Sequence, residues 1–396
     1  MPKSTLKFKR PSGRKPVIVQ ILPTLVGGGV ERGTVEMARA IQAAGGSAVV
    51  ISNGGPLVRH IERCGGKHIT LPVHVKNPFR WPGLRRKLKT IFHNEDADIV
   101  HVRSRVPAWL ALNLAKSMSI ATVSTVHSRF TTQSILKRRY NAKLLDAGHV
   151  IAISNYVHGL ITSQYIGVEN RLTVVHRGVD IETFDPAAVS QARIIKFADT
   201  VALPEGVSVI MMPARSSSWK GHFILLNALA KLKDLNFFCL FVGASDGKGG
   251  FLKRITDYAH ARGLEGRFRL TPVVDDMPAA LMVADVVVMP SVTPEPFGRV
   301  ALEAQAMGRP IVAFAHGGAV ESIEHEKTGW LATPGDADSL AKNLSAALSL
   351  KPTARKAYAR IARSHIEEHF STNQMCQKTL KIYRRMLAKN RKNNTV

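Results

Sequence analysis

The sequence is poor in cysteine and in aromatic residues, and it has no long apolar run. Its three cysteines stand far apart in 396 residues without a CxxC pair, so we expect a reducing compartment and no disulfide framework. Phe, Trp and Tyr together make up 6% of the chain. No apolar run reaches the roughly 18 residues that a membrane-spanning helix requires, so none is expected.

Acidic residues are also scarce relative to basic ones. The chain has 55 Lys and Arg against 29 Asp and Glu, a formal net charge of +26. Residues 1–180 hold 27 basic and 9 acidic side chains, so the excess is concentrated there. A field of this size attracts polyanions, which include nucleic acids, anionic lipids and phosphorylated substrates. Charge alone does not choose among them, so the choice depends on motifs.

Short runs rich in Val and Ile alternate with helical patterns along the whole chain. Examples are Val17–Leu22 and Ala48–Ser52 in the first half, and Val207–Met212 and Val286–Met289 in the second. Continuous apolar strands between helices indicate parallel sheets covered on both faces. Two such series predict an α/β fold of two tandem Rossmann-like, doubly wound domains that face a cleft.

The expected domain boundary lies after residue 190. The stretch from Asp180 to Glu205 contains Pro186 and Pro204 and no clear strand, which is typical of a linker. Residues 1–190 then form the first domain and residues 191–372 the second, and a helix over 373–396 is expected to pack back on the first. Ligands of such sheets bind at the carboxyl ends of the strands, so the loops there are the candidates.

The first candidate loop is Gly27-Gly28-Gly29, which follows Val17–Leu22. Consecutive glycines let backbone amides approach an anion, and a following helix start adds partial positive charge. The dinucleotide fingerprint fails, because Arg32 stands at the third glycine position and no acidic residue follows Ser52-Asn53. A nicotinamide cofactor is therefore not expected, and the alternative to an anion site is a tight turn without a ligand.

Two loops of the second half carry charged residues. Arg215 and Lys220 follow Val207–Met212, and a guanidinium and an ammonium so spaced can converge on a diphosphate. Glu295-Pro296-Phe297-Gly298-Arg299 follows Val286–Met289, with Glu303 further on. Pro296 suits the first turn of a helix, so we expect the next amides to point at a ligand. Taken alone, Glu295 would be a solvated or capping residue.

These motifs together resemble the retaining glycosyltransferases of family 4, which have the GT-B fold. The resemblance covers most of the chain from Pro23 to about Phe370 and includes Val175–Asp180, Gly308–Val312 and Gly317-Gly318. The spaced glutamate pair with its surrounding sequence is specific, whereas the glycine loop by itself is not.

The resemblance implies a role for each matching residue. The second domain would bind a nucleotide sugar, and the first would take the acceptor. His127 would lie near the reacting carbon and Glu295 would face the donor sugar, as the two catalytic residues. The implied donor-binding residues are Arg215 and Lys220 at the diphosphate, Gly28 and Gly29 closing on the donor, Phe297, Gly298, Arg299 and Val300 through their amides, and Glu303 at the ribose.

We expect neither a metal nor a cofactor besides the donor. Fixed cations and helix amides can stabilise the departing diphosphate without a metal. Two Asp-x-Asp strings exist, Asp96/Asp98 before a strand and Asp336/Asp338 at a helix start, which places them on the wrong side or in a capping role. The resemblance implies retention of configuration, and a front-face displacement is the preferred hypothesis.

Two basic segments with interleaved apolar residues, 76–89 and 129–143, suit an anionic membrane surface, or else they form a solvated basic face. We therefore expect a cytoplasmic protein that is peripheral on the inner membrane. Its acceptor would be a saccharide or a lipid-linked saccharide, as in lipopolysaccharide synthesis. A UDP-hexose is the favoured donor and GDP-mannose the second.

Sequence features suggest two alternatives to a glycosyltransferase. Gly243-Ala244-Ser245-Asp246-Gly247 matches the nucleophile elbow of a serine hydrolase, although the glycines after it favour an open loop. The net charge suggests a nucleic-acid-binding protein without transferase activity. No helix-turn-helix, zinc or RNA-binding signature supports that reading, so we expect no nucleic-acid partner.

Overall fold

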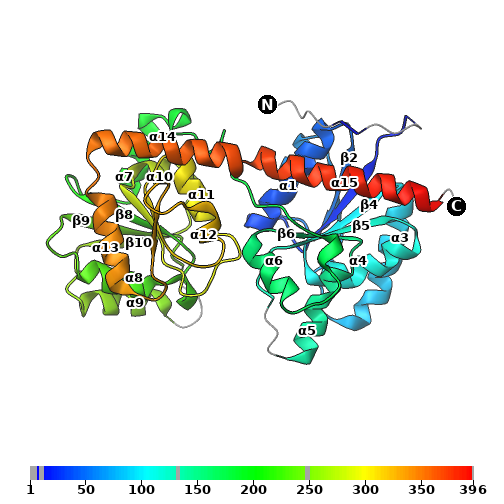
Figure 1. Cartoon of the computed structure of the whole chain (residues 1–396), viewed down its shortest axis with the longest axis horizontal. Helices are drawn as coiled ribbons and strands as arrows, with labels where there is room; N and C mark the ends of the chain where they lie inside the picture. The colour runs from blue at the N-terminus through cyan, green and yellow to red at the C-terminus, as the bar shows by residue number, and fades with distance from the viewer. Residues whose placement is uncertain (1–6, 9–12, 131–133, 246–249, 395–396) are drawn as a thin grey trace. The chain divides into compact units, whose positions relative to one another are not determined.

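The computed structural model describes residues 7–8, 13–130, 134–245 and 250–394 (Figure 1). The chain divides into two compact units. Unit 1 comprises Met1–His176 and Thr372–Val396, and unit 2 comprises Arg177–Ser371. The stretch with Pro186 and Pro204 predicts this division somewhat later, after residue 190.

Unit 1 is built on a seven-stranded sheet in which neighbouring strands are parallel. The order is β3-β2-β1-β4-β5-β6-β7. The central strands are Val- and Ile-rich and buried along their whole length, as strands covered on both faces should be. The strands are β1 (Val17–Ile21), β2 (Ser47–Ser52), β3 (Lys67–Thr70), β4 (Ile99–Val102), β5 (Ala121–Val126), β6 (His149–Ala152) and β7 (Leu172–Val174).

Helices cover this sheet. Helices α1 and α15 share one core with Ile18, Val50 and Val123, so the C-terminal helix packs on unit 1 (Figure 1). Helix α4 contacts β4 and β5, and α3 packs beside it. The helices of unit 1 are α1 (Gly29–Ala43), α2 (Val58–Arg63), α3 (Trp81–Asn94), α4 (Arg105–Ser117), α5 (Ile135–Ala142), α6 (Asn155–Thr162) and α15 (Thr372–Asn394).

Unit 2 repeats the plan with a six-stranded parallel sheet. Its order is β10-β9-β8-β11-β12-β13. The strands are β8 (Ser208–Pro213), β9 (Phe237–Val242), β10 (Phe268–Thr271), β11 (Val286–Met289), β12 (Ile311–Phe314) and β13 (Trp330–Ala332).

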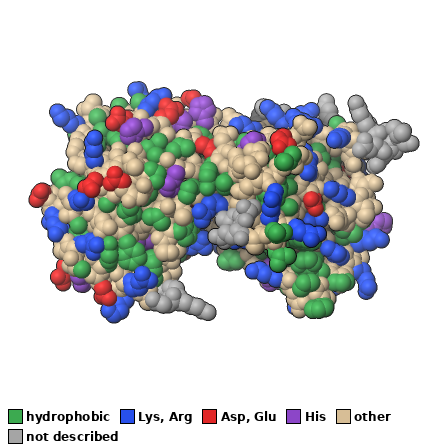
Figure 2. Space-filling model, turned by 60° about the horizontal axis from the view of Figure 1, so that its bottom comes forward, with side chains coloured by type: hydrophobic (Ala, Val, Ile, Leu, Met, Phe, Trp, Pro, Cys, Tyr) green, Lys and Arg blue, Asp and Glu red, His purple; other side chains and the backbone are tan. Residues whose placement is uncertain are grey.

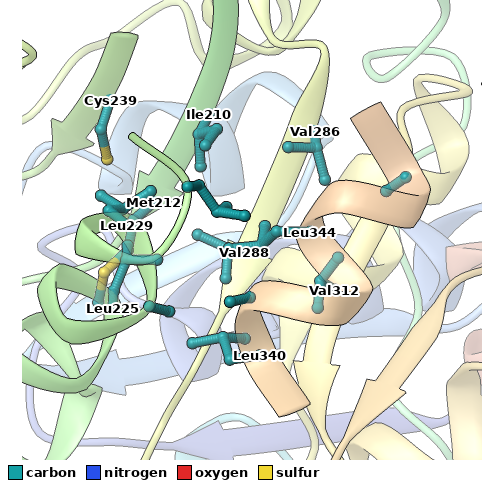
Figure 3. Packing of buried hydrophobic residues seen from close by; sticks show 14 of the residues in the cluster. Ile210, Met212, Leu225, Leu229, Cys239, Val286, Val288, Val312, Leu340 and Leu344 are labelled. Carbon is teal, nitrogen blue, oxygen red and sulfur yellow. The ribbon is translucent and has the colours of Figure 1, made fainter. Parts of the chain in front are cut away.

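The core of unit 2 lies between the sheet and the helices α8 and α13. Ile210, Val288 and Val312 point from the strands toward Leu225 of α8 and Leu344 of α13 (Figure 3). The helices of unit 2 are α7 (Gln191–Thr200), α8 (His222–Ala230), α9 (Phe251–His260), α10 (Met277–Val283), α11 (Arg299–Ala306), α12 (Ala319–Ser322), α13 (Ala337–Leu348) and α14 (Pro352–His369).

Both sheets have the doubly wound strand order, which confirms the expected fold class. In unit 1 the chain winds outward from β1 to β3 and then restarts at β4 on the other side of β1. In unit 2 it does the same from β8 to β10 and restarts at β11. Among the residues that the structure describes, no helix has the length and apolarity needed to span a membrane.

Candidate active site

The winding direction of unit 2 reverses between β8 and β11, which are neighbours in the sheet. Ligands of doubly wound folds bind outside the carboxyl ends of the strands at such a reversal point. The loop after β8 carries Arg215 and Lys220, and the loop after β11 carries Glu295. The sheet order therefore brings the two charged loops predicted as candidates to the same edge of the sheet.

Lys220 and Glu295 form a largely buried ion pair there. The Lys220 Nζ lies 2.7 Å from Glu295 Oε1, and the two side chains are only 15% and 13% exposed. The same Nζ lies 4.2 Å from the centroid of the Trp219 ring. Ser291, which follows β11, places its Oγ 2.5 Å from Glu295 Oε1. A buried carboxylate needs such donors, because burial without them is costly.

Arg215 differs from Lys220 in being exposed. It pairs with no carboxylate in the part of the chain that the structure describes. Of the two cations predicted for a diphosphate, one is thus held by a glutamate of the site and the other is available to an anion. Both lie on the loop between β8 and α8, where a ligand at the reversal point would meet them.

Helix α11 begins at Arg299, and Gly298 is its N-cap residue. The expectation that Pro296 stands in the first turn is therefore wrong, and Phe297, which is buried, also precedes the helix. Gly298 takes φ +89°, a left-handed conformation that favours glycine, and this turn delays the helix start. The first-turn amides of Arg299 and Val300 have no carbonyl one turn earlier in the helix to bond.

Glu303 lies just over one turn into α11, which begins at Arg299. Its Oε1 is 3.0 Å from a terminal nitrogen of Arg299, and the side chains are 13% and 20% exposed. Each glutamate of the predicted pair is therefore matched with a cation of its own site, Glu303 with Arg299 and Glu295 with Lys220.

A glycine pair after β12 supports the Glu295 loop. The Gly318 amide donates to the Glu295 carbonyl at 2.9 Å. A Cβ on Gly318 would lie 2.3 Å from Phe297 Cα, and one on Gly317 would lie 2.4 Å from the Glu295 carbonyl oxygen. Only glycines allow the two loops to approach this closely, so Gly317 and Gly318 have a packing role that spacing alone did not reveal.

The glycine loop of unit 1 opens helix α1. Gly28 is the N-cap residue, with an extended backbone, and the helix begins at Gly29. The Glu31 carboxylate folds back over this point, with its Oε2 2.5 Å from where a Cβ on Gly28 would stand. A carboxylate interacts favourably with a helix start, so Glu31 occupies a position suited to an anion.

His127 directly follows β5 and is half-buried. Behind it lies a buried polar network that sequence reasoning missed. His101 Nδ1 is 2.5 Å from the Tyr383 hydroxyl of α15, and Nε2 is 2.7 Å from Thr125 Oγ1. Burial, together with the positive charges of Arg103 and His127, holds the pKa of His101 well below its usual value. No local pattern could have joined residues so far apart in the sequence.

The structure does not support a serine nucleophile at Ser245. Its amide donates to Ser216 Oγ at 3.0 Å, and helix α9 begins only at Phe251. A nucleophile elbow requires a sharp turn from strand directly into helix. Gly247, the last residue of the matching string, lies outside the described residues.

Both Asp-x-Asp strings have structural partners. Asp98 accepts a hydrogen bond from the Val17 amide at 2.8 Å and pairs with Arg14. Asp336 caps α13 through the amides of Asp338 and Ser339. Within the described ranges, no group of three or more His, Cys, Asp or Glu side chains could hold a metal ion.

Comparison with known proteins gives matches over most of the chain. Residues 195–365 match the family described as Glycosyl transferases group 1. Residues 27–183 match the family described as Glycosyltransferase Family 4. The two matches fall on the two halves of the chain that carry the motifs described above.

Individual proteins agree with these matches. The crystal structure of a glycosyltransferase from Rickettsia africae is 34% identical, covers 94% of this chain and 99% of its own, and superposes with a TM-score of 0.87. The D-inositol 3-phosphate glycosyltransferase of Salinispora tropica is 32% identical over 62% of this chain, and the chain spans about half (52%) of its length. The Anabaena protein HepE, solved in complex with UDP and glucose, is 23% identical, with a TM-score of 0.80 over 92% of this chain and 98% of its own.

Proposed function

The chain belongs to the group 1 glycosyltransferases of family 4, and from this premise we propose that it moves a hexose from a nucleotide-diphosphate sugar to a saccharide or lipid-linked saccharide. The observation that carries the proposal is the cluster at the β8–β11 reversal point. Lys220 and Glu295 pair there just before the start of α11, and Arg215 lies on the same loop as Lys220, in the position where this fold binds nucleotides.

The diphosphate would bind to the cations and the helix start. Arg215 is exposed and able to turn toward the diphosphate. The first-turn amides of Arg299 and Val300 provide the partial positive charge of the helix start. Lys220 reaches the diphosphate by exchanging part of its contact with Glu295. Negative charge grows on the leaving diphosphate as the sugar departs, and preorganised positive groups stabilise that charge.

The glutamates would hold hydroxyl groups. Glu295 accepts hydrogen bonds from the donor hexose, and Glu303, further along α11, accepts them from the nucleotide ribose. Their ion pairs with Lys220 and Arg299 orient both carboxylates. The amides from Phe297 to Val300 are proposed to bind the donor at the same turn, and Gly28 and Gly29 of unit 1 are proposed as further donor-binding residues.

The donor proposed first is a UDP-hexose, with GDP-mannose as the alternative. The Anabaena neighbour, which shares the fold, was solved with UDP and glucose, and this supports the uracil nucleotide.

The proposed reaction retains the configuration of the sugar and needs no metal. The bond between the anomeric carbon and the diphosphate oxygen breaks, and the acceptor oxygen bonds to that carbon on the same face. The acceptor proton passes to the leaving phosphate oxygen. His127 lies near the reacting carbon in this scheme, and the cations and helix amides supply the charge stabilisation that a metal would otherwise give.

The acceptor is proposed to be held at an anionic membrane surface, at the cytoplasmic face of an inner membrane, as in lipopolysaccharide-type glycan synthesis. On unit 1, Ile135 and Leu136 of α5 are 82% and 80% exposed, directly before three basic residues. Phe79, just before the basic helix α3, is 92% exposed. Figure 2 shows Lys and Arg side chains over one face of unit 1 with hydrophobic side chains among them. Apolar tips among cations suit an anionic lipid surface.

The test is a panel of UDP- and GDP-sugars assayed for thermal stabilisation of the protein and for slow hydrolysis without acceptor. We expect one sugar nucleotide to stabilise the wild type and to be hydrolysed. Arg215→Ala should lower kcat/KM by about 10²–10³-fold, because a charged contact to the leaving group is lost. Arg360→Ala, an exposed arginine on α14, is the matched control and should change little. No response to any sugar nucleotide, or equal effects of the two variants, would refute the proposal.

A further inference from the structure

Ser291 and Lys220 both contact the same carboxylate oxygen of Glu295. The Ser291 Oγ lies 2.5 Å from Glu295 Oε1, and the Lys220 Nζ lies 2.7 Å from the same atom. A carboxylate can only accept, so the serine hydroxyl donates. Ser291 is 2% exposed and belongs to the loop just after β11, four residues before Glu295. The serine is therefore a fixed, buried donor to a residue of the candidate active site.

The geometry also distinguishes the two oxygens of Glu295. Both donors use Oε1, while Oε2 accepts no hydrogen bond from the residues that the structure describes. Two short bonds on one oxygen fix the plane of the carboxylate, since charge-assisted bonds of this length are strong and directional. The second oxygen keeps its capacity to accept a hydrogen bond from a ligand.

Lys220 and Ser291 differ in whether they can keep their hydrogen bond to Glu295 when a nucleotide sugar binds. Lys220 is a charged group on a flexible stem that also serves the diphosphate, so its contact with Glu295 weakens as the anion arrives. Ser291 is short, uncharged and buried, so it stays. We propose that Ser291 is a positioning residue, which holds Glu295 with Oε2 toward the donor hexose while Lys220 serves the diphosphate. This inference rests on the proposed function.

The experiment compares Ser291→Thr with Ser291→Val, because these two side chains have the same shape and differ in the hydroxyl. Hydrolysis of the sugar nucleotide that the panel identifies is the assay. We expect kcat/KM to be about 10–100-fold lower for Ser291→Val than for Ser291→Thr, the range for a hydrogen bond to a charged group. Binding of the free nucleoside diphosphate should agree within about twofold, since Glu295 faces the sugar.

A double-mutant cycle separates positioning from a purely structural role. In a Glu295→Gln background the difference between Ser291→Thr and Ser291→Val should shrink to less than about threefold, because the group being positioned has changed. Thr379→Val removes the hydroxyl of another buried residue, which bonds the Met375 carbonyl within α15 of unit 1, and is the matched control, with activity near that of the wild type.

Each outcome decides the matter. Equal activity of the Thr and Val variants, or an equal difference in both backgrounds, overturns the positioning role and leaves the proposed function intact. A wild type that neither binds nor hydrolyses any sugar nucleotide overturns both. A Thr variant as inactive as the Val variant, with both folded by their melting temperatures and binding nucleoside diphosphate, also counts against the serine hydroxyl.

Discussion

The buried ion pair between Lys220 and Glu295 gives the sharpest test of the site, through the variant Lys220→Met. At 2.7 Å, two unit charges attract by about 6 kcal/mol at an effective dielectric constant of about 20. Desolvation of both groups offsets much of this attraction. Removing one partner nevertheless leaves the other charge buried and unpaired, which typically costs about 3–5 kcal/mol.

The exposure of the two side chains sets the expected magnitude. The side chains of Lys220 and Glu295 are 15% and 13% exposed, so water can partly solvate the carboxylate that loses its partner. We therefore reduce the expected loss of unfolding free energy to about 2–4 kcal/mol. For a cooperative unit of about 200 residues this lowers the melting temperature by about 4–16 °C. The assay is thermal unfolding followed by circular dichroism or calorimetry.

A second pair of the same length provides the control. Lys231 and Asp338 also lie 2.7 Å apart, but their side chains are 48% and 77% exposed. Lys231→Met should therefore cost less than about 1 kcal/mol. The double variant Lys220→Met/Glu295→Gln should recover a large part of the lost stability, since no buried charge remains. If Lys220→Met destabilises no more than Lys231→Met, the reasoning on burial is refuted.

Three further predictions concern other parts of the chain. Gly318→Ala should lower both melting temperature and turnover, because its Cβ would lie 2.3 Å from Phe297 Cα, whereas Gly159→Ala, which meets nothing within 4 Å, should be tolerated. Burial lowers the pKa of His222 to about 4, so this residue alone should make stability fall by about 1 kcal/mol per pH unit from pH 6.5 toward pH 4, where the unfolded state binds the extra proton. Burial also lowers the pKa of His101 and His149, which add to the slope, so His222→Phe should reduce the slope in urea unfolding by about that amount and leave the rest. An unchanged slope would contradict the assignment. Replacing Ile135 and Leu136 by Ser should reduce flotation with anionic liposomes several-fold and leave hydrolysis of the soluble donor unchanged; equal flotation of variant and wild type would argue against insertion.

The central strands could be predicted from the sequence, as could the edge strands β7 and β10, whereas the edge strands β3 and β13 could not. Buried strands such as β1 and β11 are continuous apolar runs, because both of their faces are covered. The edge strand β3 reads Lys67-His68-Ile69-Thr70 and is mostly exposed or half-buried, so it lacks that signal. The other missed strand, β13, also lies at a sheet edge and has only three residues.

Within the site, residue types could be predicted but their partners could not. The loops after β8 and β11 follow from the winding order, which the strand pattern predicts. The pairing of Lys220 with Glu295, 75 residues apart, depends on how two loops approach, and spacing does not encode that. The sequence predicts the start of α11 too early, because Pro296 is a strong helix-start signal, whereas the left-handed turn at Gly298 delays the helix to Arg299.

The ion pairs of the candidate site explain why its glutamates are compatible with the proposed anionic ligand. Lys220 and Arg299 are each matched by a carboxylate, and Arg215 adds a further positive charge. Two carboxylates close to a diphosphate would repel it if they were bare, yet here each shares its charge with a cation that the diphosphate also attracts. In the proposed site, diphosphate binding would thus exchange one set of ion pairs for another, and the cations would not be buried alone at any stage. A carboxylate that loses its lysine in this exchange must keep another donor to remain oriented, which the hydroxyl of Ser291 supplies.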